Sequence, residues 1–290
     1  MRGRILFLPQ RARRTQRKKN NSQTGGMKMA ILGHGYGSEF HLLRWMGRHR
    51  EEFTRRVSKI VGSQTVTWFD FNFNNRNSVP DGEIHGFSFL GQGKYQNQAR
   101  NLLKRVRSKE LWCCWPDGGN SISWDAVGRT ESGRFILCEA KAHKKELVSS
   151  ISRKTTLDSR AMIFKALEGT KEHIGIDSRS DWRQHYYQLA NRLYVQAVLD
   201  SVGIDAVLLN IYFIGDAFPS DNTQCPATQD EWEEAIKKEY ETLGIPRKGN
   251  SFIENHVRDL FLPVSLEKGP RVIGPWGYRI GIVRCRDKAD

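Results

Sequence analysis

The chain has 290 residues, of which 38% are hydrophobic and 27% charged, a composition that is typical of a folded protein and excludes a fibrous or wholly disordered chain. Its net charge is +14, but residues 1–28 contribute nine Lys or Arg and no acid, so the rest of the chain carries only +5. This mild excess favours a polyanionic partner without establishing one.

The five cysteines have neither a CxxC pair nor a spacing typical of disulfides, which predicts reduced thiols and a cytoplasmic location. No apolar run reaches the roughly 18 residues that a membrane-spanning helix needs, so no membrane partner is expected. The sequence is compatible with a homodimer but does not indicate an oligomeric state.

The basic segment 1–28 is expected to be a disordered tail. Met27 and Met29 offer natural starts just before the first apolar run, so the segment could precede the working protein. A disordered arm that binds nucleic acid, a nuclear signal and an Arg-rich organelle presequence are the other interpretations. No later prediction depends on this segment.

The first predicted helix covers residues 38–57, where apolar side chains recur every three to four positions and Ser38 can cap the start. Glu39 lies one turn before Leu42 and Leu43 and is expected to point the same way as this apolar stripe. An acid on a core-facing side needs a partner or an ion. A solvated acid at the start of the helix is the alternative.

Residues 65–73 alternate and are rich in β-branched and aromatic side chains, which predicts a strand. A second helix is expected at 95–106, inside an insertion (72–111) that the rest of the predicted fold does not require. The basic face of this helix is typical of a solvated surface, with phosphate contact as the alternative.

The middle of the chain predicts a β-hairpin, with one strand at 121–130, a tight turn, and a returning strand at 134–143. On the returning strand Glu139 and Lys141 are two residues apart, so their side chains project from the same face. Thirteen residues lie between Asp125 and Glu139, enough for Asp125 to come level with Glu139 across the turn.

An amphipathic helix is predicted at 181–203, followed by an apolar strand at 204–216 and an acidic surface helix at 229–244. This order of elements predicts an α/β fold with a mixed central sheet flanked by helices. We expect a core at 29–216 and a C-terminal extension, 217–290, packed on it.

The carboxylates of Asp125 and Glu139, with an intervening backbone carbonyl, would make an oxygen site for Mg²⁺ or Mn²⁺. Such an ion neutralises charge on a phosphate and lowers the pKa of a bound water. A lysine beside that water can orient it, which is the role open to Lys141. These residue types predict hydrolysis of a phosphodiester.

Asp125, Glu139, Ala140 and Lys141 form the arrangement D-x13-E-A-K on a hairpin, with a helix before it and a Gln-bearing helix after it. This arrangement resembles the PD-(D/E)XK nuclease superfamily, whose members have a restriction-endonuclease-like core. The resemblance implies that Asp125, Glu139 and the carbonyl of Ala140 bind Mg²⁺ or Mn²⁺, and that Lys141 positions the attacking water.

The same resemblance implies two further site residues outside the hairpin. A metal-binding acid on the first helix would be Glu39, and a catalytic glutamine on the following helix would be Gln188, with Gln184, Asn191 or Arg192 nearby. From periodicity alone, a polar stripe on that helix is more typical of a solvent face.

The sequence therefore predicts a metal-dependent nuclease that acts on DNA more readily than on RNA through Asp125, Glu139, Lys141 and Gln188. The alternative is a non-catalytic module of the same fold that binds nucleic acid or protein. A structural Glu–Lys pair on an exposed hairpin would also explain the pattern, although the apolar neighbours on both strands argue against exposure.

Overall fold

The computed structural model describes five main stretches and several short pieces of the chain. The stretches are 35–69, 122–152, 155–177, 179–217 and 225–266, and the pieces are 84–85, 89, 115–116, 271–273 and 279–281. The tail at 1–28 and the helix predicted at 95–106 lie outside these residues.

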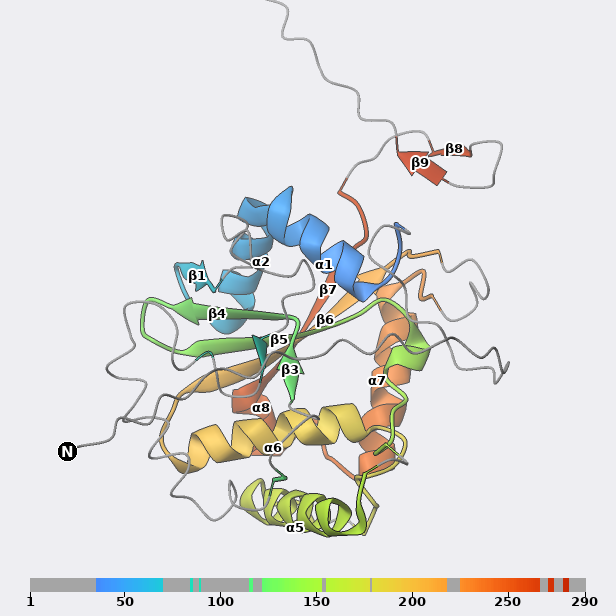
Figure 1. Ribbon diagram of the computed structural model, residues 1–290. Coiled ribbons are helices and arrows are strands. Elements are labelled where there is room, and N and C mark those ends of the chain that lie inside the picture. The colour runs from blue at the N-terminus through green and yellow to red at the C-terminus, as the bar shows by residue number, and fades with distance from the viewer. Residues whose placement is uncertain are drawn as a thin grey trace, which may run out of the picture.

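A five-stranded mixed sheet forms the centre of the molecule (Figure 1). Its strands, in spatial order, are β1 (Val66–Trp68), β4 (Ala126–Thr130), β5 (Phe135–Lys141), β6 (Ala206–Ile214) and β7 (Val257–Pro263). The first three strands run antiparallel to one another, and β6 and β7 add to β5 in parallel. Two short antiparallel pairs form sheets of their own: β2 (Ile84–His85) with β3 (Ser123–Trp124), and β8 (Arg271–Ile273) with β9 (Arg279–Gly281).

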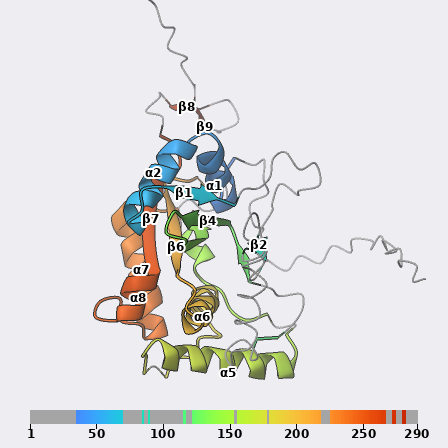
Figure 2. The ribbon, with the colours of Figure 1, turned by 90° about the vertical axis from the view of Figure 1, so that its left-hand side faces the viewer.

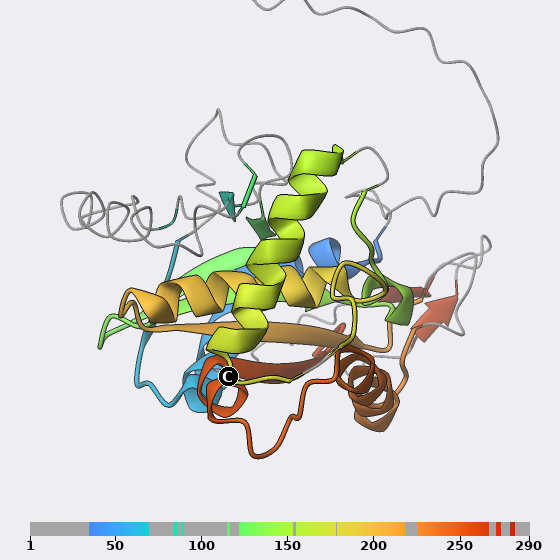
Figure 3. The same cartoon turned by 90° about the horizontal axis from the view of Figure 1, so that it is seen from below.

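Helices cover both faces of the sheet, so the predicted α/β fold with a mixed sheet flanked by helices is confirmed (Figures 1 and 2). One face is covered by α1 (Ser38–Gly47) and α2 (Arg50–Val61), and the other by α6 (Tyr187–Ser201). Helix α5 (Leu157–His173) packs on the outer side of α6 and crosses it at a steep angle (Figure 3). The other helices in the described part of the chain are η3 (Lys144–Glu146), α7 (Gln229–Leu243) and α8 (Ser251–His256). No helix in the described stretches is long and apolar enough to cross a membrane.

The alternation of side chains along β5 divides the core into two layers. Phe135 and Leu137 join the hydrophobic cluster on the α6 side, whereas Ile136, Cys138 and Ala140 join the cluster under α1 and α2. Every residue of β5 is buried. Polar side chains that follow Leu137 on the α6 side are therefore carried into the interior.

Three predicted boundaries differ from the structure. The single helix expected at 38–57 is wrong, because the chain turns at residues 48–49 and forms α1 and α2. The helix expected from residue 181 begins only at Tyr187. The sheet continues past residue 216, since β7 pairs with β6 and Trp232 of α7 is in the main core.

Gly128 on β4 allows the edge strand β1 to approach closely. A Cβ placed there would lie 3.0 Å from the ring of Trp68 and 3.1 Å from the side chain of Val66. Replacing Gly128 by Val should lower the free energy of unfolding by about 1–3 kcal/mol, because overpacking forces neighbours apart. The matched control is Gly47→Ala at the exposed end of α1, where a Cβ would meet nothing within 4 Å. Urea unfolding measures the stability of both variants. Equal stability of the two would contradict the close packing of β1 on Gly128.

Candidate active site

The hairpin of β4 and β5 brings Asp125 level with Glu139. Ala126 pairs with Cys138, so the register continued by one residue sets Asp125 opposite Glu139. The chain bends at Asp125, which divides the predicted strand 121–130 into β3 and β4. Its amide donates to the carbonyl of Cys138 at 3.1 Å, and its Oδ2 accepts from the amide of Ala140 at 2.7 Å. These two bonds hold Asp125 against β5.

The carboxylate of Glu139 is the centre of a buried network. Its Oε1 accepts from Lys141 Nζ at 2.5 Å and from Gln188 Nε2 at 2.5 Å. Its Oε2 accepts from Arg192 Nε at 2.9 Å and Nη2 at 2.6 Å. Lys141 Nζ also donates to Gln188 Oε1 at 2.9 Å, which closes a ring of three side chains. One buried anion is thus shared by two cations and an amide.

Helix α6 supplies Gln188 and Arg192 from the same face because the two residues are four apart. The start of the helix is fastened to the loop after β5, where Ser149 Oγ accepts from the amide of Gln188 at 2.8 Å. The guanidinium of Arg192 lies 4.9 Å from the centre of the Trp124 ring, a cation–π distance. The structure therefore brings the predicted Gln188 to Glu139 and adds Arg192 as a direct partner.

Burial and charge act in opposite directions in this network. Burial by itself would raise the pKa of Glu139, but Arg192 and Lys141 outweigh it and lower that pKa below its ordinary value. Burial, reinforced by Glu139, raises the pKa of Asp125 to about 7. Burial by itself would lower the pKa of Lys141, but the nearby acids, of which Glu139 has the largest effect, raise that pKa above its ordinary value. At neutral pH Glu139 is therefore ionised and Lys141 is charged, while Asp125 titrates near neutrality.

A small cavity of about 20 Å³, which is room for about one water molecule, lies against the network. It is lined by Glu139, Lys141, Leu147, Gln188, Leu189, Arg192, Asn210, Tyr212 and Glu239. Asn210 pairs with Glu139 across the parallel β5–β6 ladder, and its Nδ2 donates to Asp259 Oδ1 at 3.1 Å. Burial raises the pKa of Glu239 to about 8, with Asp259 and Glu139 reinforcing the shift and Lys141 opposing it.

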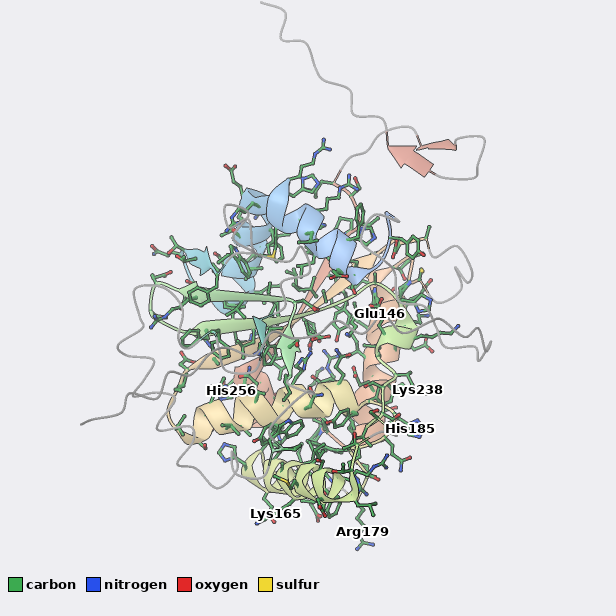
Figure 4. The ribbon with its side chains drawn as sticks, viewed as in Figure 1. Glu146, Lys165, Arg179, His185, Lys238 and His256 are labelled. Carbon is green, nitrogen blue, oxygen red and sulfur yellow. The ribbon has the colours of Figure 1, made fainter. Side chains whose placement is uncertain are left out.

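A further acid, Glu146, lies in the η3 turn just after β5 (Figure 4). Its Oε2 accepts from the amide of Ala142 at 3.0 Å, and Ser38 at the start of α1 donates to the same carboxyl group. Burial raises the pKa of Glu146, and Lys141 opposes the rise. The start of α1 therefore approaches the site through Ser38.

The prediction that Glu39 points the same way as the apolar stripe of its helix is wrong. Glu39 is exposed, whereas the buried positions of α1 are His41, Leu42, Trp45 and Met46. These side chains pack on the sheet face opposite to the one that carries Glu139. Glu39 lies in the first turn of α1, where its exposed carboxylate interacts favourably with the helix dipole.

No protein-family model, curated protein or solved structure matches this chain. The likeness of the hairpin to the PD-(D/E)XK superfamily rests on the residues themselves.

The acceptors at the hairpin suit a hard divalent cation by type. Asp125 and Glu139 are carboxylates on adjacent strands, and Asp125 Oδ1 has no hydrogen-bond partner among the described residues. Glu139, however, is already paired with both Lys141 and Arg192. Within the described ranges, no three His, Cys, Asp or Glu side chains are gathered so that they could hold an ion. An ion would therefore have to displace a donor from Glu139.

Glu239 and Glu146 are two acids near the site that the sequence did not predict. Helix α7 was expected to be an acidic surface helix, but Trp232, Ile236, Tyr240 and Leu243 form a buried stripe along it. Glu239 is seven residues after Trp232, so it shares that stripe. The position of Glu239 within this apolar stripe was a signal that it would be buried. The many exposed acids of the same helix obscured that signal.

Proposed function

We propose that the chain is a metal-dependent nuclease of the PD-(D/E)XK type with a restriction-endonuclease-like core, and that it hydrolyses phosphodiester bonds in DNA more readily than in RNA. The observation that carries the proposal is the convergence of Asp125, Lys141 and Gln188 on Glu139, on one buried face of the sheet. A hairpin pair kept only for its own ion pair would not need to be buried.

In this proposal Asp125, Glu139 and the carbonyl of Ala140 would hold Mg²⁺ or Mn²⁺. A bound divalent ion would supply charge neutralisation at the phosphate and a lowered pKa for a water. Lys141 offers three donor hydrogens on a flexible stem and would orient the attacking water. Gln188 fixes the position of the Lys141 ammonium, because its Oε1 accepts from Lys141 Nζ while its Nε2 donates to Glu139.

The first test is a substrate panel with the full chain. Supercoiled, linear and single-stranded DNA, and RNA, are incubated with Mg²⁺ or Mn²⁺ and in parallel with EDTA. We expect cleavage that depends on the metal, strongest on DNA. Lys141→Met, which keeps the length of the side chain and removes the ammonium, should lower the cleavage rate by at least about a hundredfold. The same cleavage rate in this variant would remove Lys141 from the mechanism.

A non-catalytic module that binds nucleic acid or protein is the second candidate. It is favoured by the full pairing of Glu139, both of whose oxygens accept from cationic or amide donors. Binding of DNA, measured by anisotropy, without cleavage of any substrate under either metal would support the module and contradict the nuclease.

A further inference from the structure

Glu239 is a buried acid from outside the hairpin that faces the same cavity as Glu139 and Lys141. Glu239 is only 3% exposed, and its carboxyl group makes no hydrogen bond to any residue that the structure describes. Its neighbour Lys238 is exposed at the outer edge of the molecule (Figure 4). Glu239 is therefore turned inward, toward the site.

Packing does not explain an acid at this position. The other buried residues of α7 are Trp232, Ile236, Tyr240 and Leu243, and an apolar side chain would complete their stripe. A buried carboxyl group without a hydrogen bond destabilises the folded protein. Its presence indicates a function that needs an acceptor beside Lys141.

The network around Glu139 identifies that function. Lys141 Nζ occupies Glu139 Oε1, and a divalent cation at Glu139 would compete with the ammonium for that oxygen. We propose that Glu239 is a positioning residue, the second acceptor for the Lys141 ammonium, which moves to Glu239 when a divalent cation binds Glu139. This inference rests on the proposed function.

The exchange requires only a short movement. Lys141 and Glu239 line one cavity with room for about one water, and the four-carbon stem of a lysine is flexible. A carboxyl group can accept from an ammonium through its carbonyl oxygen whether or not it carries a proton. After the exchange Glu139 Oε1 keeps its bond from Gln188 and has a lone pair available for the cation. The ammonium of Lys141 stays hydrogen-bonded and inside the site.

The test is the affinity of the full chain for Mn²⁺ without substrate, measured by calorimetry. Glu239→Met removes the acceptor and keeps the length of the side chain, and it should weaken Mn²⁺ binding by about tenfold or more. Glu239→Gln retains a carbonyl oxygen and should bind within about threefold of the wild type. The matched control is Glu234→Gln on the exposed face of α7, which should leave the affinity unchanged. Wild-type affinity in Glu239→Met would overturn the inference.

A double-mutant cycle separates an acceptor for Lys141 from a direct metal ligand. In a Lys141→Met background no ammonium has to move, so Glu239→Met should then have no further effect. A further loss of about tenfold in that background would make Glu239 a metal ligand and overturn the exchange. Asp125→Asn tests the proposed function separately: if the wild type binds no Mn²⁺, or if this variant binds it equally well, the hairpin metal site fails and the exchange fails with it.

Discussion

Asp125→Asn should lower the rate of metal-dependent cleavage by about a thousandfold or more, because it removes a carboxylate ligand while keeping the shape of the side chain. Without metal, the same variant should be more stable than the wild type. Burial and the neighbouring Glu139 raise the pKa of Asp125 to about 7, so its ionisation is unfavourable in the folded chain. Loss of activity together with a gain of stability is the signature of a residue kept for function.

The gain in stability should depend on pH in a defined direction. At pH 4 the carboxyl is protonated in the folded chain and about half protonated in the unfolded chain, so the wild type and the variant should differ by only about 0.5 kcal/mol. As the pH rises toward 7 the unfolded chain loses this proton first, and the folded wild type becomes less stable than Asp125→Asn, by about 4 kcal/mol above pH 7.

Urea unfolding from pH 4 to 8.5, with and without Mn²⁺, measures this difference. Mn²⁺ should stabilise the wild type by mass action and leave the variant unchanged, so the order of stabilities reverses at high Mn²⁺. Equal stabilisation of both proteins by Mn²⁺ would place the ion elsewhere and contradict the assignment of Asp125.

The hairpin was predictable because its signals are local. The alternation of apolar side chains set the inward face of β5, and the two-residue spacing then fixed Glu139 and Lys141 on one side. The turn length set the register that brings Asp125 level with Glu139. The helix containing Gln188 was visible from its periodicity, although its start lies six residues later than predicted.

The parts that were not predicted depend on contacts between distant segments. Arg192 was named only as a neighbour of Gln188, because no local pattern shows that it would form two bonds to Glu139, 53 residues earlier. Glu239 comes from a helix beyond the expected core. Glu39 was misplaced because the helix dipole and the apolar stripe both explain an acid at that position, and only packing decides between them.

Glu139→Ala should lower the free energy of unfolding by about 3–5 kcal/mol in urea unfolding at pH 7.5. The substitution leaves the ammonium of Lys141 and the guanidinium of Arg192 buried without their shared anion. The control is Glu241→Ala, which removes an exposed partner of Lys237 at 3.8 Å and should change stability by less than about 0.5 kcal/mol.

A triple variant, Glu139→Met, Lys141→Met and Arg192→Met, shows what the buried charges are for. Replacing a whole buried ion network by apolar side chains of similar size is often neutral or stabilising. We expect the triple variant to recover most of the stability that Glu139→Ala loses, and to have no nuclease activity and no Mn²⁺ binding. A triple variant that stays as unstable as Glu139→Ala would instead show that the network serves to stabilise the sheet. Recovery would mean that the fold does not require these charges, which leaves chemistry as the reason that they are buried together.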